Sequence, residues 1–223
     1  MTKFFLLFAG LLFSGLTVYP QTANLPVKEW NAATNSPYIL YISGDGGLNS
    51  FSTGLCTTLN KAGYSLAAVN AKTYFWEKRT PEQTARVITS YLEKKFAGRN
   101  NRQLVLAGYS FGADVLPFII NKLPESMKKK LVCVMLLSPS ASTDFEIHLS
   151  DMLGIGKKRS MNVMAEINRM GNYKTVTIFG SDEHGFPVKS IKLPNYVNEK
   201  LSGGHHYEGN INEVVNAMIK YFK

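Results

Sequence analysis

A serine flanked by glycines is the feature of this sequence that most directly suggests chemistry. Residues 108–112 read Gly-Tyr-Ser-Phe-Gly, after the apolar run 104–107 and before the amphipathic stretch 113–123. The G-x-S-x-G spacing is typical of a nucleophile elbow, a tight strand-to-helix turn that exposes one hydroxyl. We therefore predict Ser110 as a nucleophile and the backbone N–H of Phe111 as one oxyanion donor. The alternative is a turn serine that caps the following helix.

A serine needs a base within hydrogen-bond reach, and the C-terminal part of the chain offers two histidines. Residues 203–207 read Gly-Gly-His-His-Tyr, between a predicted last strand at 196–201 and a predicted last helix at 211–221. Hydrolases with this elbow place the base in such a loop, after the nucleophile and the acid in chain order. We predict His205 as the base, with His206 as its rival.

An acid that orients the base should follow the preceding strand, and an acidic loop occurs there. Residues 180–184 read Gly-Ser-Asp-Glu-His after the predicted strand 174–179. Hydrolases commonly place the acid three residues after the glycine that ends the strand, which indicates Glu183. Asp182 remains an alternative and Asp144 an outside candidate. A solvated acidic turn is the interpretation without catalysis.

A glycine-rich loop after the first predicted strand could complete the oxyanion hole. Residues 43–47 read Ser-Gly-Asp-Gly-Gly, and by position the backbone N–H of Asp45 would be the second donor. The loop lacks the Lys-Ser/Thr ending of a phosphate-binding loop. Adjacent histidines on an extended loop diverge, and no third ligand accompanies them. We therefore expect neither a metal nor a cofactor.

Apolar runs alternate with helical stretches, which predicts an α/β fold of the α/β-hydrolase type. It would have a mostly parallel sheet, helices on both faces and a single domain. The expected strands cover residues 38–42, 64–69, 104–107, 131–137, 174–179 and 196–201. One expected helix ends at residue 61, and three others cover residues 81–96, 113–123 and 211–221. Ligands bind beyond the carboxyl ends of such strands, and residues 139–173 would form an insertion over that edge.

The N-terminal residues have the pattern of a secretory signal peptide. Lys3 precedes the apolar run 4–13, and polar residues follow. We expect a signal peptide at about residues 1–23 and one domain at 24–223, with an uncleaved anchor as the alternative. In a bacterial source the mature protein would be periplasmic or secreted.

The charge of the sequence favours some classes of binding partner over others. The formal net charge is +9, but the basic residues cluster in separate loops, so nucleic acid is a poor candidate and anionic phospholipid a better one. Export would allow Cys56 and Cys133 to pair, yet their apolar settings favour two buried free thiols. The sequence gives no indication of the oligomeric state.

Six strings together resemble the bacterial virulence protein AcvB/VirJ family over nearly the whole mature chain. They lie at residues 43–47, 74–76 with 79–82, 108–118, 123–124, 144–147 and 203–207. The resemblance implies an exported α/β-hydrolase-fold protein that hydrolyses lysyl-phosphatidylglycerol or a similar aminoacylated phospholipid. Tyr207 stands where Phe is expected and Leu48 where Trp is usual, which could reshape the pocket.

The resemblance also suggests residues that bind substrate. An aminoacyl ester carries an ammonium group, for which Asp114, Asp144 and Glu146 are candidates. An acid like Asp114 in the first turn of a helix is also favoured by the helix dipole alone. Tyr74 and Trp76 could wall the acyl or glycerol side, or form a hydrophobic plug. The alternatives to this substrate are a general carboxylesterase or thioesterase, and a non-catalytic binding or assembly module of the envelope.

Overall fold

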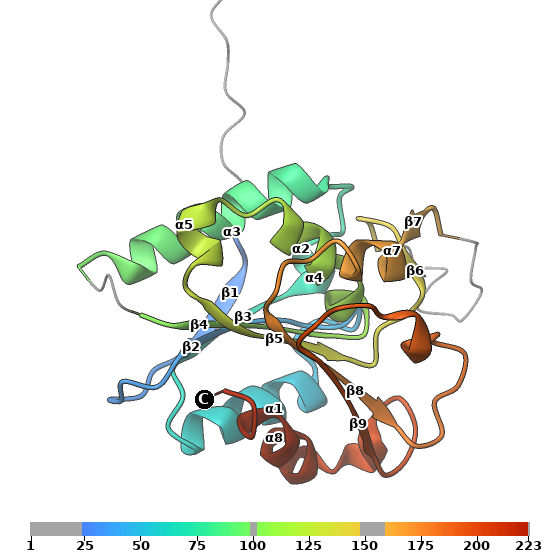
Figure 1. Cartoon of the computed structure of the whole chain (residues 1–223). Helices are drawn as coiled ribbons and strands as arrows, with labels where there is room; N and C mark the ends of the chain where they lie inside the picture. Colours follow the sequence, from blue (N-terminus) through green and yellow to red (C-terminus); the bar gives the residue numbers. More distant parts are fainter. Residues whose placement is uncertain (1–23, 99–101, 148–158, 223) are drawn as a thin grey trace, which may run out of the picture.

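The computed structural model describes residues 24–98, 102–147 and 159–222, whose centre is one mostly parallel sheet (Figure 1). Its strands are β1 (Val27–Trp30), β2 (Tyr38–Ile42), β3 (Leu66–Val69), β4 (Leu104–Tyr109), β5 (Leu131–Leu137), β8 (Lys174–Gly180) and β9 (Tyr196–Leu201). The spatial order is β1-β3-β2-β4-β5-β8-β9, and only the edge strand β1 runs antiparallel to its neighbour.

Helices cover both faces of the sheet, as Figure 1 shows. One face carries α2 (Ala71–Tyr74), α3 (Pro81–Phe96), α4 (Phe111–Asn121), α5 (Glu125–Lys128) and α7 (Val163–Ile167). The other face carries α1 (Ser50–Lys61) and α8 (Ile211–Ile219). Short elements complete the fold: the strand pair β6 (Ser142–Thr143) and β7 (Met161–Asn162), and the 3-10 turns η1 (Val188–Ser190) and η2 (Tyr207–Gly209). Within the described ranges, every helix is too short or too polar to cross a membrane.

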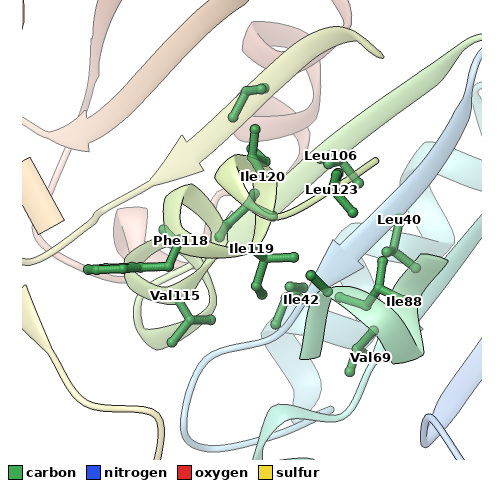
Figure 2. Close-up of a cluster of buried hydrophobic side chains, with 14 of the residues drawn as sticks. Leu40, Ile42, Val69, Ile88, Leu106, Val115, Phe118, Ile119, Ile120 and Leu123 are labelled. Atoms are coloured by element: carbon green, nitrogen blue, oxygen red, sulfur yellow. The ribbon is translucent and has the colours of Figure 1, made fainter. Parts of the chain in front are cut away.

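The central strands read as unbroken apolar runs because both of their faces are buried. Leu40, Ile42 and Leu106 point to one face and pack with α3 and α4 (Figure 2). Their strand neighbours Ile39 and Val105 point to the opposite face and pack with α1 and α8. The sheet therefore has a hydrophobic core on each side.

Helix α3 shows how local sequence sets an element's boundary. Thr80 accepts a hydrogen bond from the Gln83 N–H, and the Gln83 side chain accepts one from the Thr80 N–H. This capping box, followed by Pro81 at the first helical position, starts the helix at the predicted residue. The helix then runs to Phe96 as predicted.

The predicted strands and main helices are all present, with end residues that differ by a few positions at most. The sequence analysis missed β1, whose four residues are partly exposed and include Lys28 and Glu29. Within the predicted insertion 139–173 the structure describes β6, β7 and α7. Residues 148–158 of this insertion lie outside the described residues. Cys56 and Cys133 are free and buried, as the sequence favoured. The predicted signal peptide at 1–23 lies outside the described residues.

Candidate active site

The turn between β4 and α4 holds Ser110 in a strained backbone conformation. Its φ and ψ are 52° and −120°, a region that residues with a side chain rarely adopt. A Cβ added to Gly108 would lie 2.4 Å from the Gly112 carbonyl oxygen, and one on Gly112 would lie 2.2 Å from that of Ile42. Only glycine fits at both positions. The Ser110 side chain makes no capping bond to α4, so the capping alternative does not describe it.

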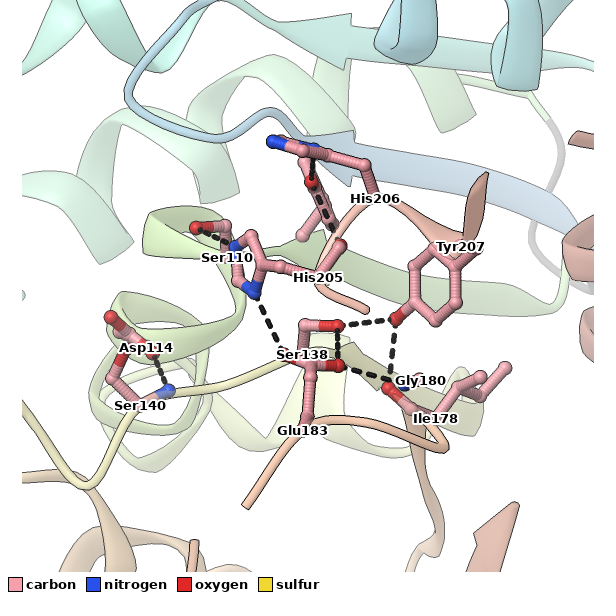
Figure 3. Close-up of polar contacts among 11 residues, drawn as sticks. Ser110, Asp114, Ser138, Ser140, Ile178, Gly180, Glu183, His205, His206 and Tyr207 are labelled. Atoms are coloured by element: carbon pink, nitrogen blue, oxygen red, sulfur yellow. Dashed lines mark hydrogen bonds and ion pairs between the residues drawn. The ribbon is translucent and has the colours of Figure 1, made fainter. Parts of the chain in front are cut away.

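The Ser110 hydroxyl instead begins a chain of hydrogen bonds across the carboxyl edge of the sheet (Figure 3). Ser110 Oγ lies 2.9 Å from His205 Nε2, and His205 Nδ1 lies 2.8 Å from Glu183 Oε1. The three residues follow β4, β9 and β8, whose carboxyl ends lie at the same edge of the parallel sheet, with β5 between β4 and β8. These distances are those of a nucleophile, a base and an orienting acid within direct reach of one another.

The carboxylate of Glu183 is held at both oxygens. Glu183 Oε2 accepts hydrogen bonds from Ser138 Oγ at 2.6 Å and from the Gly180 N–H at 2.8 Å, while Oε1 faces His205. Burial raises the pKa of Glu183, but the hydrogen bonds from His205, Ser138 and Gly180 outweigh burial and lower it. The group therefore stays ionised and can stabilise an imidazolium.

Ser138 and Tyr207 support this carboxylate, and the sequence analysis assigned neither of them a role. The Tyr207 hydroxyl lies 2.7 Å from Ser138 Oγ and donates to the Ile178 carbonyl at 2.8 Å. Ser138 directly follows β5, so its place at a strand end was the available signal. Tyr207 was noted only as a departure from an expected Phe, and its hydroxyl is the atom that makes these contacts.

The two rivals for acid and base lie apart from the chain. Asp182 is exposed, with its carboxylate on the hydroxyl of Ser181 at 2.9 Å. His206 is exposed, and its Nδ1 lies 2.6 Å from the Tyr109 hydroxyl, away from Ser110 in Figure 3. The acid loop and the histidine loop pack closely, since a Cβ on Gly180 would lie 2.3 Å from the carbonyl oxygens of Gly203 and Gly204.

The predicted oxyanion donors flank the nucleophile. Phe111 opens α4, and the loop 43–47 approaches so closely that a Cβ on Gly44 would lie 3.4 Å from Ser110 Cβ. The carboxylate of Asp45 accepts from the Gly46 N–H at 2.9 Å, which holds it within its own loop. Neither backbone N–H, of Asp45 or Phe111, has a hydrogen-bond partner among the residues described. Their role as oxyanion donors stays a prediction.

The comparison with known families decides the membership of the chain. The profile of a family described as "Bacterial virulence protein (VirJ)" matches residues 37–223. The chain belongs to the VirJ family. No curated protein sequence matches this VirJ-family chain.

Solved structures similar to this VirJ-family protein share its fold at low sequence identity. A lipase-esterase related protein from Clostridium acetobutylicum ATCC 824 has a TM-score of 0.64 at 15% identity, covering 89% of this chain and 100% of that one. An α/β hydrolase enzyme from a metagenome of lagoon sediments at Mar Chica, Morocco, has 0.62 at 18%, covering 88% and 93%. Proline iminopeptidase from Mycobacterium smegmatis has 0.62 at 11%, also covering 88% and 93%. These likenesses show the α/β-hydrolase fold.

The aromatic pair predicted to wall the substrate site of the VirJ-family protein divides between core and surface. Tyr74 is buried, whereas the side chain of Trp76 is 50% exposed. Phe75 between them packs on Phe111 beside the nucleophile, with ring centroids 5.1 Å apart. Trp76 is therefore the member of the pair that faces solvent near the elbow.

Two of the predicted ammonium-binding acids lie on a segment that pairs with this aromatic turn. The Ile147 N–H donates to the Phe75 carbonyl at 2.8 Å, so the segment that carries Asp144 and Glu146 lies beside the aromatic turn. Both are partly exposed, and Asp144 accepts from the backbone and hydroxyl of Ser160. Their role in binding stays a prediction.

The third predicted acid, Asp114, is fully buried behind the nucleophile. Its Oδ1 accepts the Ser140 N–H at 2.5 Å, and its Oδ2 lies 3.8 Å from Arg159 Nη1. Burial raises the pKa of Asp114 to about 7, against the hydrogen bond from Ser140 and the nearby positive charge of Arg159. The contacts tie α4 to the segment after β5 (Figure 3).

Replacing Asp114 by asparagine is expected to remove a pH-dependent loss of stability. Between the ordinary carboxyl pKa of 3.8 and the folded value of about 7, the folded protein binds more protons than the unfolded chain. The free energy of unfolding therefore falls as pH rises through this window, by roughly 4 kcal/mol at most. Asparagine keeps an acceptor for Ser140 but does not titrate. Urea unfolding at pH 4 to 8 should show that the free energy of unfolding of the variant rises relative to that of the wild type as pH increases. A difference that does not change with pH would contradict the prediction.

A cavity of about 540 Å³ opens beside His205 and Glu183. Its walls come from the segments after β5 and β8 and from β9, and the sequence analysis did not identify them as a pocket. The lining residues are Ser138, Pro139, Ser140, Ala141, Phe179, Glu183, His184, Gly185, Phe186, Val188, Lys200 and His205. The volume is in the range of small-molecule sites.

Proposed function

We propose that this VirJ-family protein is a serine hydrolase of carboxylic esters. The observation that carries the proposal is the continuous hydrogen-bonded chain from Ser110 through His205 to Glu183, at a strained elbow. The α/β-hydrolase fold is consistent with this activity but hosts many others. The residues at the site, not the fold, support hydrolysis.

The mechanism follows from the positions of these groups. His205 Nε2 takes the proton of the Ser110 hydroxyl as its oxygen attacks the ester carbonyl carbon. The N–H groups of Phe111 and Asp45 stabilise the oxyanion. The bond to the alcohol oxygen breaks, and His205 returns its proton to that oxygen. Water then attacks the acyl-enzyme by the same route, giving the acid and the free Ser110 hydroxyl, while Glu183 stabilises the imidazolium.

The proposed substrate is an aminoacyl-phosphatidylglycerol, with a lysyl or similar acyl group. Membership of the VirJ family supports this substrate, as does the formal net charge of +9, which favours approach to anionic phospholipid. Asp144 and Glu146 are the proposed partners of the substrate's ammonium groups, and Trp76 is the proposed contact on its acyl side. Asp114 is buried and ion-paired, so it would act on this site through Ser140.

Export is part of the same proposal. The apolar leader at residues 1–23 supports a periplasmic or secreted protein, where aminoacylated lipids of the envelope would be within reach. N-terminal sequencing of the protein recovered from the envelope and from the medium would test this. An intact Met1 in the cytoplasmic fraction would contradict export.

Hydrolysis of lipid vesicles tests the substrate directly. We expect purified protein to release free amino acid from phosphatidylglycerol vesicles that contain lysyl- or alanyl-phosphatidylglycerol, measured by mass spectrometry against the Ser110→Ala variant. Turnover of soluble p-nitrophenyl esters without release from these vesicles would instead indicate a general carboxylesterase or thioesterase. No turnover and no labelling of Ser110 by a fluorophosphonate would indicate a non-catalytic module.

A further inference from the structure

The cavity beside His205 lies next to the proposed catalytic base. Its lining includes His205 and Glu183 but not Ser110, so it lies on the base's side of the nucleophile. In serine hydrolysis the base returns its proton to the departing alcohol, which must therefore lie next to the imidazole. The cavity beside His205 is therefore a candidate site for the alcohol half of the ester.

The charges that line the cavity differ from those expected for an ammonium site. Glu183 is its only carboxylate, and both oxygens are already engaged by His205, Ser138 and the Gly180 N–H. A substrate ammonium would therefore find no free carboxylate there. An ammonium-bearing acyl group fits better on the side of Asp144 and Glu146.

Lys200 is the only lysine or arginine among the residues that line the cavity. No carboxylate of the described residues lies within ion-pair distance of its ammonium. Its strand neighbour Glu199 points to the opposite face of β9, where it meets Lys220 at 3.6 Å and the Tyr221 hydroxyl. Glu199 therefore does not neutralise Lys200. The cavity lining beside Lys200 also includes Phe179 and Phe186, whose ring centroids are 5.2 Å apart.

We propose that this cavity is the leaving-alcohol site and that Lys200 selects esters whose alcohol carries an anion, such as a phosphate on glycerol. The inference rests on the proposed ester hydrolysis and adds the cavity and the residue that would recognise the anion. During the step the ester C–O bond breaks, the alcohol oxygen takes the proton from His205 Nε2, and the phosphate stays intact. Lys200 contacts the phosphate and is a specificity residue without a proton-transfer role.

A matched pair of soluble esters tests the proposal without a lipid surface. Both carry one acyl group, chosen as whichever of alanyl, lysyl or butyryl the wild type cleaves fastest from p-nitrophenol. One is esterified to glycerol and the other to glycerol phosphate. We expect the wild type to favour the phosphate ester roughly tenfold in kcat/KM. Lys200→Gln should bring this ratio close to one and Lys200→Glu below one, mainly through a lower kcat/KM for the phosphate ester.

Controls separate the possible outcomes. Lys192→Gln removes an exposed lysine outside the cavity lining and should keep the wild-type ratio. An unchanged ratio in Lys200→Gln, or no preference in the wild type, would overturn the proposal while leaving ester hydrolysis intact. A Lys200 effect seen only with the same acyl group on vesicles of phosphatidylglycerol would also overturn it, because Lys200 would then read the charge of the membrane. Turnover of neither ester, with Ser110→Ala equal to wild type, would refute the hydrolase itself.

Discussion

Ser110→Ala is expected to lower kcat for ester hydrolysis by about a millionfold, to near the uncatalysed rate plus what the oxyanion donors supply. Alanine removes the Ser110 hydroxyl, which lies 2.9 Å from His205 Nε2, so no acyl-enzyme can form. Steady-state assays with a p-nitrophenyl ester measure this decrease in kcat. A variant that retained wild-type turnover would show that the reaction does not pass through Ser110.

The acid loop provides a graded version of the same test. Glu183→Gln should lower kcat by about a thousandfold or more, since the amide cannot stabilise the imidazolium and can fix the wrong tautomer of His205. KM should change little, because Glu183 does not hold the substrate. Asp182→Asn is the matched control one residue away, and its exposed side chain predicts activity within about twofold of wild type. Equal losses in both variants would mean that the loop, not the carboxylate, matters.

Gly112→Ala is expected to destabilise the fold by about 3 kcal/mol or more and to abolish activity with it. The new Cβ would lie 2.2 Å from the Ile42 carbonyl oxygen and 2.7 Å from that of Ser43, both backbone atoms. Neither can move without displacing α4 from β2 at the elbow itself. Chemical denaturation monitored by circular dichroism gives the stability change, and the midpoint should shift without a change in slope.

Gly204→Ala is the corresponding control. A Cβ at that position would meet no atom within 4 Å, so the free energy of unfolding should change by less than about 1 kcal/mol. Its neighbour His205 makes it a demanding control, because the same loop carries the base. If Gly112→Ala proved as stable as Gly204→Ala, the close packing at the elbow would be wrong.

Local patterns were sufficient to predict most of the sheet and to select Ser110, His205 and Glu183, which the structure joins by hydrogen bonds. Strands such as β5 are unbroken apolar runs, and α3 carries its own capping signals, so both could be read without tertiary information. The edge strand β1 lacks that signal because its side chains alternate between partial burial and exposure. Its pairing with β3 depends on a tertiary contact that no local pattern encodes.

The choice between adjacent candidates could not be made from sequence. Asp182 and Glu183 are both acids in one loop, and only the direction of each side chain separates them. The supporting pair Ser138 and Tyr207 escaped notice for a similar reason, since they lie 69 residues apart and meet only after folding. The buried state of Asp114 was also invisible, because an acid in the first turn of a helix usually faces solvent.

The hydrogen bond between Ser110 and His205 joins residues 95 positions apart, which has a consequence for when activity can begin. A chain synthesised only as far as η1 contains Ser110 and Glu183 but not His205. Domains generally fold as units during or after synthesis, so the nucleophile stays unactivated until the last strand and the histidine loop have docked. The proposed hydrolysis therefore cannot begin on a growing chain, and a C-terminal truncation before residue 205 is expected to yield an inactive protein at any concentration.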